Sequence, residues 1–158
     1  MKKINFLAKL NREKKIQIVE PNEEVKNAYL QRSEESLRSA RVLFDINNLK
    51  DSVALTYYSM YYSLLALLFR VGIKCENHTG SIMLLKQVFG VDNGQIAAAK
   101  KERVDKQYYV DFQVSRNEVS EMITIAEKFN SDVFNFIDTL NQQDIDRYRD
   151  RINEILNG

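Results

Sequence analysis

The side chains best equipped for chemistry lie in the segment Arg-Val-Asp-Lys-Gln-Tyr-Tyr-Val, which begins at Arg103. Arg103 is permanently charged, and its planar guanidinium fits the oxygen atoms of a phosphate group. Tyr108 and Tyr109 add phenols that can bind a phosphate oxygen or offer a ring to a base. Together with the carboxylate of Asp105 and the amide of Gln107, they predict a site for a nucleotide or an RNA phosphate. Ordinary packing at a helix end is the alternative interpretation.

The single histidine, His78, limits the chemistry that one chain can perform. A multi-histidine metal site and a ribonuclease mechanism with two histidines are both excluded within one chain. His78 stands where a loop is expected to enter a helix, so it could be a general base, a phosphate contact or a capping side chain; capping or packing is the favoured role. The sequence has no Gly-rich phosphate loop, no Ser-His-Asp order and no metal-ligand spacing. We therefore expect neither a metal nor a cofactor.

The composition favours one helical domain. The chain has 158 residues, of which 44% are hydrophobic and 28% charged, with only five Gly and one Pro. A domain with many strands needs more of these turn residues. The formal net charge is +1, so binding to a nucleic acid would depend on a local positive patch.

Cysteine usage and apolar runs indicate a cytoplasmic protein without a membrane segment. The single Cys75 excludes an intramolecular disulfide and a cysteine metal cluster, and it is typical of a reducing compartment. The best apolar run, residues 64–69, is shorter than a membrane span. Lys9 interrupts the apolar stretch near the N-terminus, which argues against a secretory signal.

Apolar residues recur at helical spacing along most of the chain, so the sequence predicts an all-α fold. We expect an up-and-down helical bundle of four to five core helices with an additional C-terminal helix. Asn22 is a good N-cap, Gly72 a stop signal and Ser115 the start of a capping box. The expected helices cover residues 22–47, 51 or 52 to 71, 78–89, 96–107, 115–140 and 145–155. The expected organisation is a basic N-terminal arm (1–21), with a short helix at 4–10 and an extended piece at 16–19, the bundle (22–140) and a charged C-terminal helix (141–158).

Four tyrosines form a dense turn on the second of these helices. Tyr57 and Tyr61 share one face, and Tyr58 and Tyr62 share another. We expect one pair to lie in the core and the other to line a groove or a seam between two copies of the chain.

Three segments in this order give the chain a resemblance to the HEPN superfamily, in its small prokaryotic and archaeal branch. They are the run Ala-Leu-Thr-Tyr-Tyr-Ser-Met-Tyr-Tyr-Ser-Leu-Leu-Ala-Leu-Leu from Ala54, the stretch from Gly72 to His78, and the segment that begins at Arg103. The resemblance covers residues 22–140. It implies a helical bundle that forms a homodimer, with equivalent motifs of two chains around a shared cleft.

The resemblance also implies functions. Many HEPN proteins are metal-independent ribonucleases, often toxins, whose motif is an Arg followed four to six residues later by His. Small members often act with a minimal nucleotidyltransferase, which serves as the antitoxin and can adenylylate a tyrosine near that motif. Here Arg103 matches the motif Arg, Tyr108 or Tyr109 takes the place of the His, and Val104 stands where a polar residue is common. A phenol that titrates near pH 10 is a poor general base at neutral pH.

Two hypotheses follow. In the first, the chain is the toxin-like member of such a pair: Arg103, Asp105, Gln107 and His78 bind a nucleotide or RNA phosphate, and Arg103, Tyr108 and Tyr109 support cleavage of RNA without a metal. In the second, the bundle is a non-catalytic interaction or nucleotide-binding module that partners a nucleotidyltransferase. A third idea makes Tyr108 or Tyr109 the acceptor of an adenylyl group.

Overall fold

Seven α-helices and one short pair of strands make up the part of the chain that the computed structural model describes, residues 2–108 and 113–158. In chain order they are α1 (Lys2–Arg12), β1 (Ile16–Ile18), α2 (Glu23–Asp45), α3 (Leu49–Val71), β2 (Ile73–Cys75), α4 (His78–Gln87), α5 (Gly94–Tyr108), α6 (Arg116–Thr139) and α7 (Gln142–Asn157). The predicted all-α bundle is confirmed.

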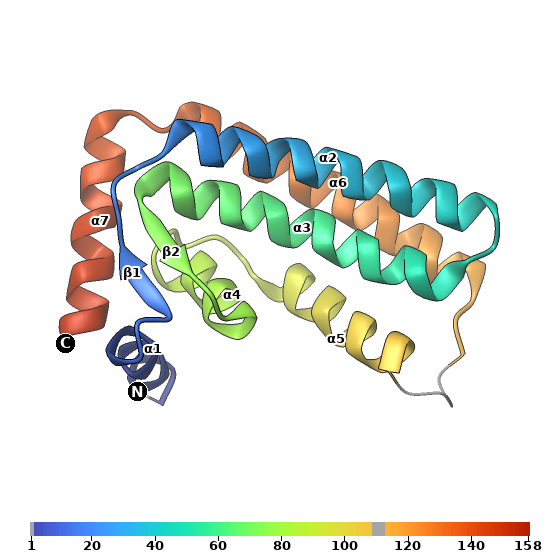
Figure 1. Cartoon of the computed structure of the whole chain (residues 1–158), viewed down its shortest axis with the longest axis horizontal. Coiled ribbons are helices and arrows are strands. Elements are labelled where there is room, and N and C mark those ends of the chain that lie inside the picture. The colour runs from blue at the N-terminus through green and yellow to red at the C-terminus, as the bar shows by residue number, and fades with distance from the viewer. Residues whose placement is uncertain (1, 109–112) are drawn as a thin grey trace.

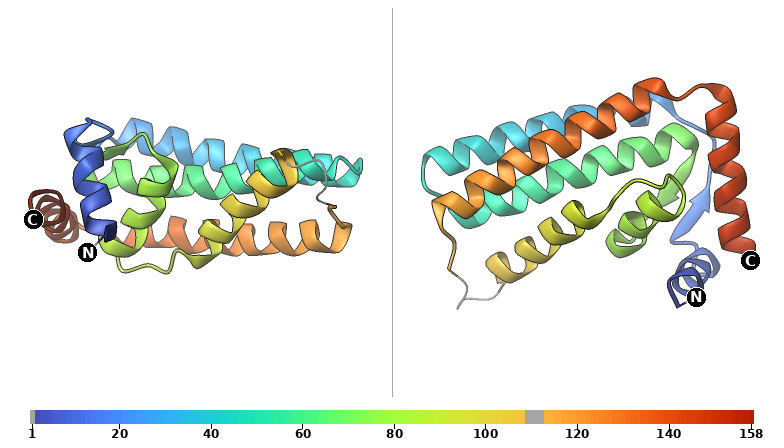
Figure 2. Two further views of the ribbon diagram at one scale, coloured as in Figure 1. Left: turned by 90° about the horizontal axis from the view of Figure 1, so that it is seen from below. Right: turned by 180° about the vertical axis from the view of Figure 1, so that it is seen from behind.

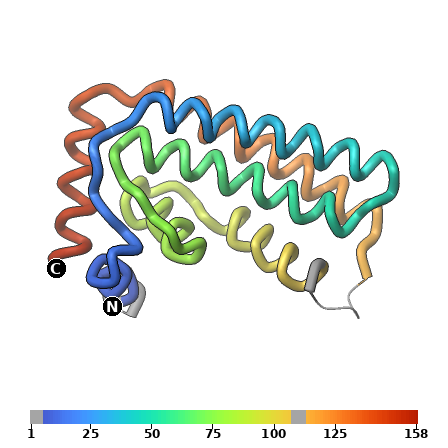
Figure 3. The backbone as a smooth tube through the Cα atoms, in the orientation of Figure 1, coloured from blue at the N-terminus to red at the C-terminus, as the bar shows by residue number. Residues whose placement is uncertain are grey.

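The bundle is arranged around α3, which packs against α2, α5 and α6. Figure 1 shows α2 and α5 on either side of α3, with α6 behind, and the view from behind in Figure 2 shows α6 lying across the back. Helix α7 turns away at one end of the bundle, and both chain termini lie at that end (Figure 3). This arrangement leaves α3 uncovered by another helix on the front face.

The local start and stop signals act largely as expected. The side chain of Asn22 accepts a hydrogen bond from the backbone N–H of Val25 at the start of α2, and Gly72 ends α3 in the left-handed conformation. Ser115 accepts from the N–H of Glu118 at the start of α6. The start of α3 was predicted two or three residues too late, because the helix already begins at Leu49. Ser52 does not cap it but donates its hydroxyl hydrogen to the carbonyl of Ala40.

The basic arm packs onto the body of the protein. β1 pairs antiparallel with β2, a strand that lies in the stretch between Gly72 and His78 and that the sequence did not predict. Leu7, Leu10 and Ile16 are buried in the core. Arg149 of α7 fixes this end of the bundle, because its Nη1 donates to the carbonyls of Val19 and Val71, both at 2.8 Å.

The expectation about membrane segments needs a correction. Helix α3 is long and apolar enough to cross a membrane by length and composition, although its longest unbroken apolar run is short. However, 78% of its most apolar window is buried inside the protein. Its apolar character is therefore that of a bundle's central helix, and no membrane protein is indicated.

A buried polar network joins α2, α3 and α6. The hydroxyl of Ser63 donates to Oδ1 of Asn130 at 2.7 Å, and Nδ2 of Asn130 donates to Oγ of Ser59 at 3.2 Å. Ser33 of α2 donates to the carbonyl of Ser59 at 2.7 Å. Because a buried polar group that loses its partner is costly, the network favours one alignment of the three helices.

The Asn130→Ala variant is expected to lose about 2 kcal/mol of unfolding free energy, because Ser63 and Ser59 lose partners in a dry environment. Urea denaturation followed by circular dichroism would measure the loss. Asn135 lies on the same helix and is exposed, so Asn135→Ala is the matched control and should change stability by less than about 0.5 kcal/mol. Equal losses in both variants would contradict the role given to the network.

Candidate functional site

The tyrosines of α3 divide as the sequence predicts. Tyr57 and Tyr61 are buried, whereas Tyr58 and Tyr62 are half-buried. The two stripes lie side by side on the helix, and the rings of Tyr57 and Tyr58 contact each other at a centroid distance of 5.5 Å. Tyr57 and Tyr61 are therefore part of the core, and they lie beneath the rings of Tyr58 and Tyr62, which reach the surface.

His78, the first residue of α4, packs against the two buried tyrosines, Tyr57 and Tyr61. Its ring stacks on that of Tyr61 with centroids 3.9 Å apart and planes 8° apart. Its Nδ1 forms a hydrogen bond of 2.8 Å with the hydroxyl of Tyr57. The capping role belongs to Asn77, whose side chain accepts from the N–H of Gly80. His78 is thus fixed in position by two aromatic rings.

Arg103 of α5 contacts Tyr57, which is hydrogen-bonded to His78, and the neighbouring Tyr58. Its Nη1 donates to the hydroxyl of Tyr58 at 3.3 Å. The guanidinium carbon lies 5.3 Å from the ring centroid of Tyr58 and 5.5 Å from that of Tyr57, within the range of a cation–π interaction. The structure therefore gathers Arg103 and His78, 25 positions apart in the sequence, around Tyr57 and Tyr58.

The other predicted residues lie at the C-terminal end of α5 and directly after it. Asp105 forms an ion pair with Lys101 on the same helix, with 3.8 Å between the charged atoms. Gln107 and Tyr108 close α5, and the structure describes their backbone but not their side chains. Tyr109 lies outside the described residues.

The electrostatics of the cluster favour a neutral imidazole beside a permanent cation. Burial, and then the positive charges of Arg103 and Lys100, lower the pKa of His78 below its ordinary value of 6.5. Burial also raises the pKa of Tyr57 far above 10 and that of Tyr61 to about 12, so both phenols keep their protons. At neutral pH the described part of the site carries the charge of Arg103 and several neutral hydrogen-bonding groups. This combination suits a phosphate.

The Arg103→Ala variant is expected to raise the pKa of His78, because a repelling positive charge is removed. His78 is the only histidine, so its C2–H resonance can be followed by NMR as a function of pH. In the wild type the folded pKa lies below the unfolded one, and the stability linked to His78 is lost as the pH falls below about 6.5. Arg116, which contacts Phe44 at the far end of α2, supplies the control: Arg116→Ala should leave the pKa unchanged. An unchanged pKa in Arg103→Ala would contradict the geometry.

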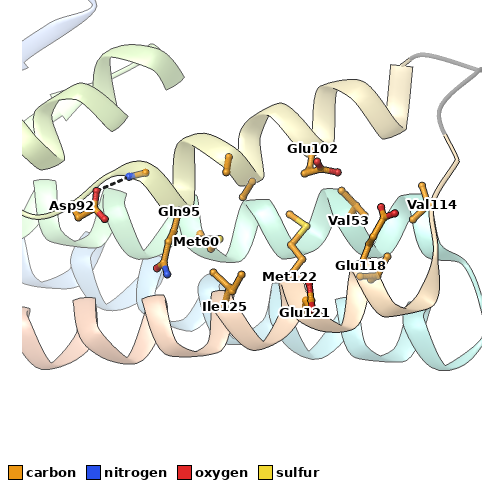
Figure 4. Close-up of a pocket in the computed structure, with 14 residues that line it drawn as sticks. Val53, Met60, Asp92, Gln95, Glu102, Val114, Glu118, Glu121, Met122 and Ile125 are labelled. Atoms are coloured by element: carbon orange, nitrogen blue, oxygen red, sulfur yellow. Dashed lines mark hydrogen bonds between the residues drawn. The ribbon is translucent and has the colours of Figure 1, made fainter.

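A separate pocket of about 480 Å³ opens between α3, α5 and α6 (Figure 4). Its walls include Val53, Met60, Met122 and Ile125, and four carboxylates line it: Asp92, Glu102, Glu118 and Glu121. An apolar pocket with acidic sides repels phosphate. The pocket is therefore not part of the phosphate site, which is formed by Arg103, His78, Tyr57 and Tyr58.

Sequence reasoning found Arg103 and His78 by residue type but missed Tyr57 and Tyr58 as their partners. Helical spacing showed which tyrosines share a face. It carried no information on which face would meet α4 and α5, since that depends on how the helices pack.

Known proteins are similar to this chain. The family model described as "HEPN domain" matches residues 27–137. A protein of Methanocaldococcus jannaschii described as "Putative toxin MJ0605" is 28% identical over 109 residues, which are 65% of this chain and 81% of that protein. The "UPF0332 protein PH1297" of Pyrococcus horikoshii is 38% identical over 76 residues, 48% of this chain and 49% of that protein.

Proposed function

Since the chain belongs to the HEPN family, we propose that it is the toxin-like component of a pair whose other member is a minimal nucleotidyltransferase. The similarity to the M. jannaschii protein supports the toxin-like part of this proposal. The single observation that carries the biochemical part is the convergence of Arg103 and His78 on Tyr57 and Tyr58. The protein acts as a homodimer in the cytoplasm, with two such sites around a shared cleft.

Each site binds a nucleotide or an RNA phosphate. Arg103 supplies the charge and a planar set of donors, while Asp105 and Gln107 on the same helix orient the sugar or the base. Tyr57 donates to Nδ1 of His78, because a buried hydroxyl hydrogen needs an acceptor and Nδ1 is the one recorded for it. His78 then carries its proton on Nε2 and donates it in a hydrogen bond to a phosphate oxygen.

The same site supports cleavage of RNA without a metal. The 2′-oxygen attacks the adjacent phosphorus, the bond to the 5′-oxygen breaks, and the products are a 2′,3′-cyclic phosphate and a 5′-hydroxyl. The 2′-hydroxyl releases its proton to solvent water, and the leaving 5′-oxygen takes up a proton from solvent water. Arg103 stabilises the charge that develops on the phosphate oxygens, and Tyr108 or Tyr109 positions the attacking hydroxyl.

A second function is a non-catalytic module that binds a nucleotide and the nucleotidyltransferase. The observation that favours it is the absence of His after Arg103 in the sequence. A neutral His78 with its proton on Nε2 is a donor and not a base, which favours it further.

A cleavage assay with EDTA present separates these functions. RNA is incubated with wild-type protein, Arg103→Ala and the distant control Arg116→Ala, and the products are analysed for a cyclic phosphate end. Cleavage by the wild type and the control but not by Arg103→Ala is the expected result for a ribonuclease. RNA binding without cleavage would support the second function, that of a non-catalytic binding module. Cleavage at an unchanged rate by Arg103→Ala would exclude the proposed mechanism.

A further inference from the structure

The space between α5 and α6 forms an apolar groove with acidic side chains along its rim. We propose that this groove is the docking site for an amphipathic helix of a partner protein, a helix with one apolar face and with lysines or arginines beside that face. The proposal is independent of the Arg103 site, because none of the residues that would hold a phosphate takes part in it.

The groove arises from the way in which α5 and α6 share the surface of α3. Both helices pack closely against α3 but contact each other little. A cavity of about 480 Å³ lies between them (Figure 4), and a cavity of about 390 Å³ adjoins it. Asp92 and Gln95 line both cavities, which are therefore parts of one groove, the α5–α6 groove.

Along one side of the α5–α6 groove, α6 presents a continuous series of apolar side chains. They recur at steps of three or four residues: Val119, Met122, Ile125, Phe129, Val133 and Phe136. From the first to the last of them the helix rises about 26 Å at 1.5 Å per residue. Figure 4 shows Met122 and Ile125 pointing from α6 into the space beneath α5. A long groove with apolar positions at this spacing suits the apolar face of another helix of about 17 residues.

Ile125 marks the open mouth of the groove. It is one of three large hydrophobic residues that are exposed in the described part of the protein, with 41% of its surface accessible. Beneath it, Val53 and Met60 of α3 are buried and line the cavity. Exposed apolar surface that continues into an apolar cavity and has a polar rim is typical of a surface that binds another protein.

Carboxylates from both walls determine the charge that the occupant should carry. Glu102 comes from α5, whereas Glu118 and Glu121 come from α6 (Figure 4). Glu118 forms an ion pair with Lys106 at 3.4 Å. For Glu102 and Glu121, no ion pair is recorded among the residues that the structure describes. A helix with cationic side chains on both sides of its apolar face would pair with these two carboxylates on opposite walls.

The acidic rim favours a basic protein helix over other occupants. Its charge repels the phosphates of a nucleic acid and the head groups of an anionic membrane. A second copy of the chain offers little that fits, because its basic helix α1 buries Leu7 and Leu10 in its own core. The other exposed large hydrophobic residues, Val42 and Ile46, are only two side chains near the end of α2.

The test uses a synthetic, fluorescently labelled peptide of about 17 residues, with Leu at steps of three and four and Lys beside the Leu face. A twin peptide has Glu in place of every Lys. Fluorescence anisotropy measures the affinity of the whole protein for each peptide. The wild type should bind the Lys peptide at least tenfold more tightly than the Glu peptide.

Two variants test the groove, each with a matched control. Ile125→Lys places a positive charge at the mouth and should weaken binding of the Lys peptide at least tenfold, whereas Val42→Lys, at another exposed hydrophobic residue, should not. The double variant Glu102→Gln with Glu121→Gln should weaken it about tenfold. Asp138 is exposed on α6 outside the groove, so Asp138→Asn should bind as the wild type does.

The contrary results overturn the proposal in different ways. If the wild type binds neither peptide, the groove is not a docking site for such a helix. Equal affinity for the two peptides, or equal losses in Ile125→Lys and Val42→Lys, would show apolar adhesion without a specific site. A lower mass of Ile125→Lys in sedimentation, with no binding of peptide by the wild type, would make a second copy the occupant. Arg103→Ala should bind the Lys peptide as the wild type does, which separates this test from that of the phosphate site.

Discussion

Replacing Arg103 with Ala is expected to abolish the growth arrest that the proposed toxin-like function predicts for expression of this protein in a bacterial host. Arg103 is the only permanent cation recorded against Tyr57 and Tyr58 within the described residues, and its guanidinium is the group that fits a phosphate. Loss of a charge-assisted pair of hydrogen bonds corresponds to about 1.5–3 kcal/mol, or roughly 10- to 100-fold in affinity. Colony counts after induced expression would measure the effect.

The Arg103→Lys variant tests the shape of the group. It keeps the charge but lacks the planar fork, so its toxicity should lie between that of the wild type and that of Arg103→Ala. Arg116→Ala serves as the control, because Arg116 contacts Phe44 and Asn47, far from the site. Full growth arrest by Arg103→Ala at an equal protein level would contradict the account.

The Gly72→Ala variant is expected to cause the largest loss of stability. Gly72 has a φ of +82°, which disfavours any side chain, and a Cβ there would collide with Nη1 of Arg149 and the carbonyl oxygen of Val19. These are the two partners of a hydrogen bond that ties α7 to the chain leaving β1. Strain and the lost contact together should lower the unfolding free energy by about 3–5 kcal/mol.

Gly90 separates the two causes of that loss. It has a φ of +67°, but nothing lies within 4 Å of a Cβ added there. Gly90→Ala therefore carries only the backbone cost, on the order of 1–2 kcal/mol. Thermal unfolding should show a melting temperature roughly 10 °C lower for Gly72→Ala, and a fall about a third as large for Gly90→Ala. Equal falls would show that crowding around Gly72 contributes nothing.

The helices could be predicted from the sequence because their signals are local. Asn22, Gly72 and Ser115 act through bonds within three or four residues, and apolar spacing alone locates the helices between them. The short ladder between β1 and β2 could not be predicted in the same way. Each strand has three residues, and the pairing joins positions that are 55 to 59 residues apart.

The candidate site was predictable only in part, for a related reason. Residue chemistry identified Arg103 and His78, but their meeting depends on the packing of α5 and α4 against one face of α3. A second contact between helices has the same origin: Tyr29 of α2 stacks with both Tyr62 and Phe69 of α3, which no periodicity within one helix indicates. Patterns along one helix show which residues share a face, whereas contacts between helices decide what that face does.

The most direct measurement is the equilibrium affinity of the wild-type protein and of Arg103→Ala for a labelled 2′-O-methyl RNA in EDTA. Circular dichroism would first verify that both proteins are folded. The account predicts that the wild type binds, and that Arg103→Ala binds at least tenfold more weakly. Equal affinity of the two folded proteins would contradict the central claim, that Arg103 on its tyrosine platform is the group that holds the phosphate.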